Sequence, residues 1–423
     1  MNKDRKSSNN FSKTFRTNSN SKSTQSAFTI VELLVVIVII GILATITIVS
    51  YTGITAKANA SALQSDLTNA SKKLTMYYTE HGFYPSTIDA TTKCPKDSLN
   101  NPDTNYCIKP SSSSTVLVYN LNTMVTPNTY SLTATNSNLT YGVGSNSPPV
   151  SMNTNITCPS GFIKVPGSPT YGTNSFCVMK YIASQVGATT TPISTSGTLP
   201  WVNISQTTAI ANSPNVAGCT GCHLITEAEW LTIAQNVLSV ASNWDNGAGV
   251  HTVGTGYIYS GHNDNAPASA QAAGTDNDGY VGTGGNVAPS NQRRTLTLTN
   301  GEVIWDLAGN VWQWTAGQST TGQPGNTGNA YASWIQWPSV AITGSLSPSP
   351  FPATTGITGS NTWTGTNGIG QLLSNPAEAG LRGFLRGGNW IIGSIAGVLA
   401  LNLNYAPSNT FSAVGFRVAS PAP

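Results

Sequence analysis

The sequence predicts an α+β protein with one long N-terminal helix, a small β region and a large C-terminal domain with few helices and many loops. Near the N-terminus, an apolar run changes into an amphipathic helical pattern that continues to about His81. Apolar and polar residues then alternate, as in strands around a turn, over residues 130–143. The chain from residue 156 to 420 is rich in Gly, Asn, Thr and Trp and contains one clear helical pattern.

Composition indicates an exported protein. Only 8% of the residues are charged, against about 25% in ordinary soluble domains. A net charge of +3 gives no argument for a nucleic-acid partner. An even number of cysteines in an exported chain favours disulfides, and local pairing is the simplest connectivity. The pairs so expected are Cys94 with Cys107, Cys158 with Cys177, and Cys219 with Cys222, the last being the least secure because a two-residue loop strains the bridge.

The N-terminus predicts a membrane span. Residues 1–27 are polar and basic, and the apolar run Phe28–Val49 that follows carries one charged residue, Glu32. A helix of this length crosses a hydrocarbon core of roughly 30 Å. The preceding basic residues predict a cytoplasmic N-terminus and an extracytoplasmic remainder. The run is longer than the apolar core of a secretory signal, and a carboxylate inside it needs a positive partner.

These residues resemble the type IV prepilins. The resemblance implies a leader at residues 1–27, cleavage between Ala27 and Phe28, and a role for Glu32 in pairing with the new N-terminus of a neighbouring subunit. Ala27 departs from the glycine that usually precedes the cut. The membrane and other pilin subunits are the implied partners, with display on a pilus or cell surface; an uncleaved single-span anchor is the alternative.

The helix is expected to continue beyond the membrane. Apolar residues recur at helical spacing and Gly82 and Pro85 end the pattern. Residues 50–144 are therefore expected to form the second half of a pilin helix and a small β head, followed by a linker at 145–155. The residues predicted to face the head are Leu63, Leu67, Ala70, Leu74 and Tyr77.

One helix is expected in the C-terminal domain, residues 156–420. It covers Ile225–Leu238, where Thr226 and Glu229 have the spacing of a capping box. Four segments resemble the formylglycine-generating enzymes, whose fold is a variant of the C-type lectin fold: ITEAEW (225–230), WDLAGNVWQWT (305–315), RGGNW (386–390) and GFRVAS (415–420). We interpret them as scaffold, with Trp305, Trp312, Trp314 and Trp390 in the core and with Arg386 and Arg417 in buried pairs that include Asp306.

The copper ligands of that enzyme family are missing. Its catalytic members hold copper with two cysteines shortly after the RGG-x-W segment, whereas the last cysteine here is Cys222. No cofactor is therefore expected, and we predict no enzymatic activity. An extracytoplasmic enzyme of the formylglycine-generating type remains the alternative.

Two further motifs have alternative interpretations. Cys219-Thr220-Gly221-Cys222-His223 is the C-x-x-C-H pattern of c-type haem attachment, and a small structural disulfide is the alternative. Asp276 and Asp278 lie in a glycine-rich loop, where either a structural calcium or an Asp-capped turn is expected.

The stretch 386–420 places apolar residues where a loop would carry polar ones. It resembles the variable region of target proteins of diversity-generating retroelements, which implies a diversified binding surface; an ordinary terminal hairpin is the alternative. The implied ligand-binding residues are Asn389, Ile391, Ile392, Ser394, Ile395, Val398, Leu399, Asn404, Tyr405, Asn409, Phe411, Ser412, Ala413 and Val414.

The sequence thus predicts a non-catalytic adhesin or ligand-recognition protein on a pilus or cell surface. Its ligand would be a protein or glycan on another cell, a phage or a host. A purely structural minor pilin, without a separate binding face, is a third interpretation.

Overall fold

The computed structural model describes residues 30–422 except 97–99, 123–126, 246–255, 284–291, 320–324, 327–332, 338–341, 344–364 and 375–379. The chain divides into two compact units, Met1–Lys57 and Ala58–Pro423. The predicted leader and the cleavage position between Ala27 and Phe28 lie outside the described residues.

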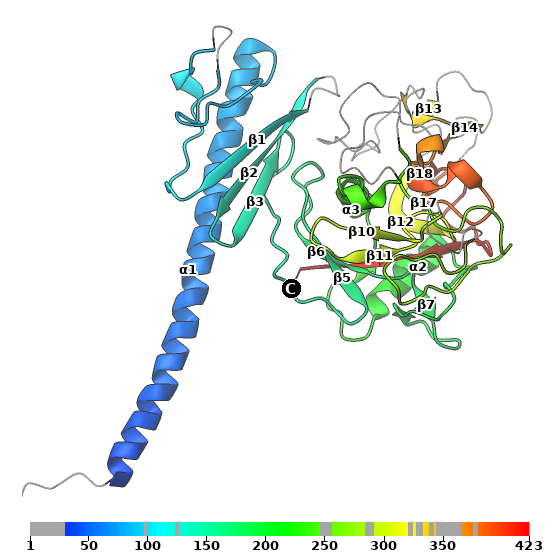
Figure 1. Ribbon diagram of the computed structural model, residues 1–423, viewed down its shortest axis with the longest axis horizontal. Helices are drawn as coiled ribbons and strands as arrows, with labels where there is room; N and C mark the ends of the chain where they lie inside the picture. Colours follow the sequence, from blue (N-terminus) through cyan, green and yellow to red (C-terminus); the bar gives the residue numbers. More distant parts are fainter. Residues whose placement is uncertain are drawn as a thin grey trace, which may run out of the picture. The chain divides into compact units, whose positions relative to one another are not determined.

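Helix α1 (Ile30–His81) is one continuous helix, as the apolar run and the amphipathic pattern predict (Figure 1). It ends where Gly82 takes a positive φ of 78° and donates its N–H to the carbonyl of Tyr78. Among the residues that the structure describes, none of the helices is both long and apolar enough to cross a membrane.

The second half of α1 packs against an antiparallel sheet. The sheet has the order β1 (Val116–Asn122), β2 (Thr129–Asn136), β3 (Leu139–Gly144) and β4 (Val150–Ser151). The predicted strands and turn at 130–143 are therefore confirmed. Alternate residues of β2 join the core of this head with the helix residues Leu63, Leu67, Ala70 and Leu74, and Tyr77 is also buried.

The segment 145–155, which its composition predicts to be a linker, is hydrogen-bonded to the chain on both sides. It contains β4, and Val150 is buried. Ser151 accepts hydrogen bonds at its carbonyl from the N–H and hydroxyl of Ser175, and its own N–H donates to Asn174. The segment is held because its backbone groups are paired on both sides.

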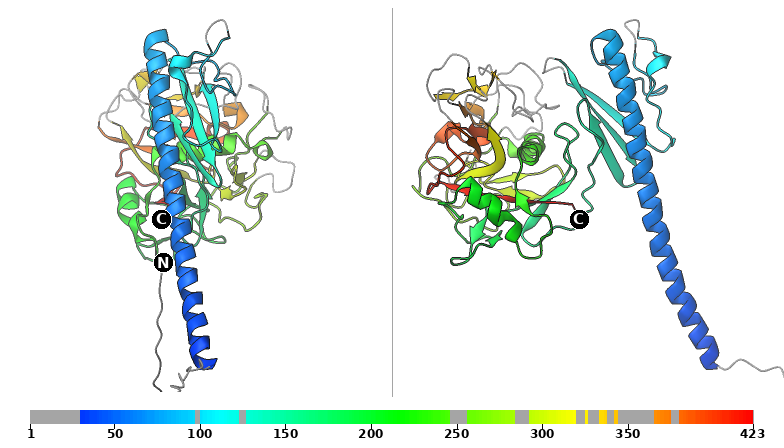
Figure 2. Two further views of the ribbon diagram at one scale, coloured as in Figure 1. Left: turned by 90° about the vertical axis from the view of Figure 1, so that its left-hand side faces the viewer. Right: turned by 180° about the vertical axis from the view of Figure 1, so that it is seen from behind.

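The C-terminal β region (residues 156–422) is built on two larger sheets. The first has the order β5-β6-β20-β9 and the second β14-β16-β18-β17-β12-β19, and the last strand, β20, is the red strand in Figures 1 and 2. The strands of the first sheet are β5 (Phe162–Val165), β6 (Phe176–Met179), β9 (His223–Leu224) and β20 (Val418–Pro421). Those of the second are β12 (Trp312–Ser319), β14 (Ser333–Ile335), β16 (Leu372–Ser374), β17 (Arg382–Gly387), β18 (Gly397–Asn402) and β19 (Val414–Phe416).

Three two-stranded ladders complete the described strands. They pair β7 (Ser184–Gln185) with β8 (Pro192–Ile193), β10 (Thr295–Thr297) with β11 (Val303–Trp305), and β13 (Gly325–Asn326) with β15 (Ile342–Thr343). The α-helices of this region within the described residues are α2 (Gln206–Asn212) and α3 (Glu227–Leu238). An α+β fold with few helices is confirmed.

Helix α3 has the predicted capping box. The Thr226 hydroxyl accepts from the Glu229 N–H at 3.2 Å, and the Glu229 carboxylate accepts from the Thr226 N–H at 2.9 Å. The helix packs against β12 and β18 (Figure 1). Its Trp230 indole N–H donates to the Val398 carbonyl. It is therefore fixed to the centre of the six-stranded sheet.

The structure forms the three disulfides that local spacing favours, Cys94–Cys107, Cys158–Cys177 and Cys219–Cys222. The first closes a loop of the head, where Cys94 is buried. The second fixes the segment before β5 to the buried strand β6. The third precedes β9.

Candidate functional site

A buried ion pair joins α3 to strand β17. The Arg386 guanidinium donates to one oxygen of Glu227 through Nε at 3.0 Å and Nη2 at 2.5 Å, and to the Leu399 carbonyl through Nη1 at 3.1 Å. The other Glu227 oxygen accepts from the Thr315 hydroxyl of β12. The pair thus ties one helix to three neighbouring strands just before the chain leaves the sheet at Gly387.

The sequence assigned the wrong partner to Asp306. The Asp306 carboxylate forms a bidentate salt bridge with Arg294, whose Nε and Nη2 each lie 2.7 Å from one carboxylate oxygen. It does not pair with the guanidinium of Arg386 or Arg417. Arg417 instead donates to the side chain of Gln313 and to the carbonyls of Met179 and Trp305. Burial lowers the pKa of Arg417 to about 9, and the nearby negative charge of Asp306 offsets only part of this shift.

The WDLAGNVWQWT segment is scaffold, as interpreted. Gly309 has φ of 84°, and a side chain there would collide with the carbonyl of Gly261. Asn310, also left-handed, donates to Asp306 and to the Gln271 carbonyl. Trp305, Trp312 and Trp314 are buried as predicted, whereas Trp390 is only half-buried.

The start of one irregular segment and the end of another lie at the same end of the six-stranded sheet. The first, residues 389–395, connects β17 to β18, and the second, residues 404–413, connects β18 to β19. Gln313 pairs with Arg386 and Trp312 with Val414. Because β17 is antiparallel and β19 parallel to β12, the start of the first segment and the end of the second emerge together.

The first segment is exposed on its outer side and held through its backbone. Ile391 is 61% exposed, Ser394 is exposed, and Ile392 and Ile395 are half-buried. The Gly393 N–H donates to the Asn263 carbonyl and the Trp390 carbonyl accepts from the Asn265 N–H. Asn389 is buried and its side chain accepts from the Ile391 N–H, so it shapes the turn.

The second segment places two aromatic rings against each other. The Tyr405 and Phe411 ring centroids are 4.5 Å apart, and both rings are half-buried. Their carbonyls accept from the N–H groups of Gly383 and Asn203. Asn404 and Ala413 are half-buried, and Asn409 and Ser412 are exposed.

Three residues of the predicted set do not belong to an exposed surface. Val398, Leu399 and Val414 are buried within β18 and β19, and their assignment to a binding surface is wrong. The reason is that β18 is a central strand with core on both faces, since Leu399 and Ala400 belong to different core clusters. Of the other predicted residues, only Asn389 is also buried.

Sequence reasoning missed two tryptophans beside these segments. Half-buried Trp201 and Trp334 pack against the core cluster that also supports Ile392, Tyr405 and Phe411. Trp334 lies on the edge strand β14, and its ring stacks on Trp312 with centroids 5.8 Å apart. A tryptophan on a short edge strand is the signal that could have indicated this position.

The C-x-x-C-H motif and the Asp-rich loop have local partners. His223 places Nε2 at 3.0 Å from both oxygens of Glu229, which raises the pKa of the imidazole. Asp276 accepts from the Gly279 N–H at 2.8 Å, so it caps a turn, and its contact with Asp278 raises the pKa of the Asp278 carboxyl. Among the described residues, no group of three or more His, Cys, Asp or Glu side chains is arranged to hold a metal. The Cys219–Cys222 disulfide agrees with the structural interpretation of the first motif, and calcium binding at the Asp-rich loop stays an untested alternative.

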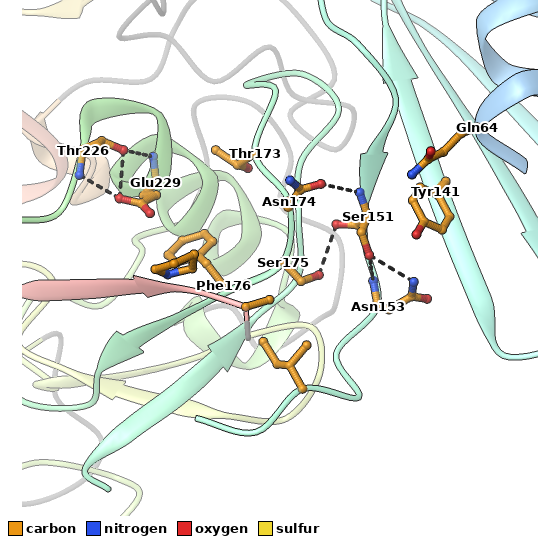
Figure 3. Close-up of a pocket in the computed structure, with 13 residues that line it drawn as sticks. Gln64, Tyr141, Ser151, Asn153, Thr173, Asn174, Ser175, Phe176, Thr226 and Glu229 are labelled. Carbon is orange, nitrogen blue, oxygen red and sulfur yellow. Dashed lines mark hydrogen bonds between the residues drawn. The ribbon is translucent and has the colours of Figure 1, made fainter. Parts of the chain in front are cut away.

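A hollow of about 450 Å³ with a mixed polar and apolar lining lies next to the capping box of α3 (Figure 3). Its lining includes Tyr141, Asn174, Phe176 and Glu229, and Figure 3 shows Asn174 bonded to Ser151 across from the capping pair. None of the ligand-binding residues predicted from the sequence lines it.

Comparison with known proteins identifies one motif. The prokaryotic N-terminal methylation motif matches residues 22–48. No curated protein matches the chain significantly.

Solved structures that match this chain include two variants of the Major Tropism Determinant and one variable protein of Treponema denticola. The Major Tropism Determinant U1 Variant is 13% identical with a TM-score of 0.28, over 68% of this chain and 64% of its own length. The P3c Variant is 14% identical with the same TM-score and coverage. Treponema denticola variable protein 1 is 14% identical with a TM-score of 0.28, over 72% of this chain and 99% of its own. The chain therefore spans 64% of the length of the first two.

Proposed function

We propose that this chain is a non-catalytic, surface-displayed recognition protein that binds its ligand with the exposed side of residues 389–395 and 404–413. The proposal is carried by one contrast: the two segments have side chains at the surface, whereas the sheet beneath them is held by buried residues. Ile391, Ile392, Tyr405 and Phe411 present apolar surface, while buried charge pairs and tryptophans hold the sheet beneath them. A cluster of apolar side chains on an otherwise polar surface is typical of an interaction site.

The N-terminal methylation motif supports display of this site outside the cell. Such a motif is typical of chains that are anchored in the cytoplasmic membrane and assembled into pili, and it matches residues 22–48 here. We propose that α1 provides the anchor and the contact with other pilin subunits, and that the C-terminal β region is the presented part.

We further propose that the two segments are diversified. Their side chains make few of the contacts that hold the fold, so that exchange at these positions costs little stability. A nearby reverse transcriptase gene and a near-copy of the final coding segment are expected. Deep sequencing of the gene from one population should find substitutions confined to codons 389–413. Identical copies throughout, with no reverse transcriptase nearby, would refute diversification and leave recognition to be tested separately.

Recognition is tested with the full chain in detergent, applied to a glycan array and to fixed bacterial and eukaryotic cells. Tyr405→Ala with Phe411→Ala should abolish binding to the probe that the wild type recognises. Leu199→Ala with Val281→Ala removes two exposed apolar side chains elsewhere and is the matched control. Equal binding by both double variants would contradict the proposal.

The alternative, an enzyme of the formylglycine-generating type, predicts a different result. It requires two sulfur ligands after residue 390, and the sequence has no cysteine beyond Cys222. Conversion of a cysteine in a sulfatase-derived peptide by the purified chain would favour this alternative, and no conversion is expected.

A further inference from the structure

The short disulfide loop Cys219–Cys222 contributes no residue to the exposed side of the proposed recognition site. The cysteines are 3 positions apart, against 13 and 19 for the other two disulfides. Cys219 is half-exposed, Thr220 and Gly221 are exposed, and Cys222 is buried. An attacking group can therefore reach one sulfur across a loop of two exposed residues, while the other sulfur stays inside the protein.

The chain on both sides of this loop is held independently of the disulfide. The Cys219 N–H donates to the Val216 carbonyl at 3.2 Å. His223 and Leu224 form β9, which pairs with Ala419 and Val418 of β20. Opening the sulfur–sulfur bond removes a cross-link around a two-residue loop, and the backbone on both sides of the loop keeps its own hydrogen bonds. The surrounding fold therefore does not have to unfold first.

A cationic side chain adjoins the buried sulfur in sequence. His223 follows Cys222 directly, and its two ring nitrogens lie at 2.9 Å from the Gly221 carbonyl and 3.0 Å from the Glu229 carboxylate oxygens. Acceptors at both nitrogens favour the imidazolium form. Because Glu229 pairs with this charge, the direction of exchange follows from exposure: attack on half-exposed Cys219 makes buried Cys222 the leaving group.

We propose that Cys219–Cys222 is an exchangeable disulfide that reacts with a protein dithiol. A thiolate of the dithiol attacks Cys219 Sγ, a new bond forms to that sulfur, and the Cys219–Cys222 bond breaks with Cys222 leaving as the thiolate. The second thiol of the dithiol then attacks the mixed disulfide and releases Cys219. The dithiol is oxidised to a disulfide, and the pair in this chain is reduced by two electrons and gains two protons.

The other two disulfides provide internal comparisons. Each also has one buried and one half-exposed cysteine, so exposure alone does not distinguish the three. Cys177 lies within the central strand β6, and Cys94–Cys107 closes a longer loop on the head. A bridge that closes a longer loop restricts the unfolded chain more and resists reduction more strongly.

The test is graded reduction of the folded full chain with dithiothreitol, followed by alkylation and peptide mass spectrometry. Cys219 and Cys222 should be alkylated about tenfold faster than the other four cysteines, with circular dichroism unchanged. Reduction of all three disulfides together, or of this pair last, would overturn the proposal.

Two variants separate exchange from general instability. Cys219→Ser with Cys222→Ser should lose the fast phase and keep the slow one; persistence of the fast phase would assign it elsewhere and reject the proposal. Cys222→Ser alone should form a mixed disulfide with oxidised glutathione at Cys219. A Cys219 thiol that stays unmodified under these conditions would show that the outer sulfur cannot be reached.

Discussion

Replacing Glu227 by Leu should destabilise the C-terminal β region more than any substitution in the two exposed segments. Arg386 is fully buried and places three donors on Glu227 and on the Leu399 carbonyl, at 2.5 to 3.1 Å. Without the carboxylate, the guanidinium keeps its charge and loses two of its three hydrogen bonds. Breaking a buried pair in this way costs about 3–5 kcal/mol, a large part of the roughly 5–15 kcal/mol that stabilises a typical domain.

The assay is urea unfolding of the full chain in detergent, followed by tryptophan fluorescence from buried Trp230 and Trp314. Glu227→Leu should shift the midpoint to lower urea with little change in slope. Glu227→Leu with Arg386→Met should recover most of the loss, because two apolar side chains leave no uncompensated charge. A double variant as unstable as the single one, or a single-variant cost below about 1 kcal/mol, would refute the charge argument.

Three further predictions test other parts of the chain. The mature protein should begin at Phe28, as N-terminal mass spectrometry would show, and Glu32→Ala should prevent pilus assembly while membrane insertion continues. Cys158→Ser with Cys177→Ser should lower the free energy of unfolding by roughly 3 kcal/mol, measured by urea denaturation, and no measurable loss would contradict this. The stabilisation from His223 should be complete below the unfolded pKa of histidine, about 6.5, and lost as pH rises through the raised pKa of the folded state. The difference in melting temperature between wild type and His223→Gln should therefore shrink over that pH range. A difference that stays constant with pH would contradict this prediction.

Local patterns in the sequence predicted local structure well. The spacing of Leu63, Leu67 and Leu74 identified the buried stripe of α1, and the positions of Thr226 and Glu229 identified the cap of α3. In both cases the interacting residues lie within a few turns of one helix. Helical periodicity and capping are determined by neighbours three or four positions apart, so one sequence contains all the information they need.

Long-range pairs could not be assigned in the same way. Arg386 was expected near Asp306, but its carboxylate partner is Glu227, 159 positions away on α3. Arg294, which the sequence did not single out, takes Asp306 instead. The choice between two buried carboxylates depends on which strand lies beside which helix, and charge patterns in the sequence do not contain that information.

The burial of β18 shows a related difficulty. Its residues Val398 and Leu399 were included among the ligand-binding residues that the resemblance to a variable region implies. The strand is central in its sheet, with α3 on one face and the cluster around Trp314 on the other. A short apolar strand that is buried on both faces cannot be distinguished from an exposed apolar patch by periodicity alone.

The exposed segments are held in a way that suits variation of their side chains. The anchors are main-chain hydrogen bonds: Gly393 N–H to the Asn263 carbonyl, Gly383 N–H to the Tyr405 carbonyl, and Asn203 N–H to the Phe411 carbonyl. A replacement at Tyr405 or Phe411 keeps its carbonyl and therefore keeps the anchor. Because both rings are half-buried and touch each other, we expect truncation of either to cost about 1 kcal/mol, more than a fully exposed residue and less than a core one. Binding specificity can thus change at these positions while the charge pairs and tryptophans beneath them maintain the fold.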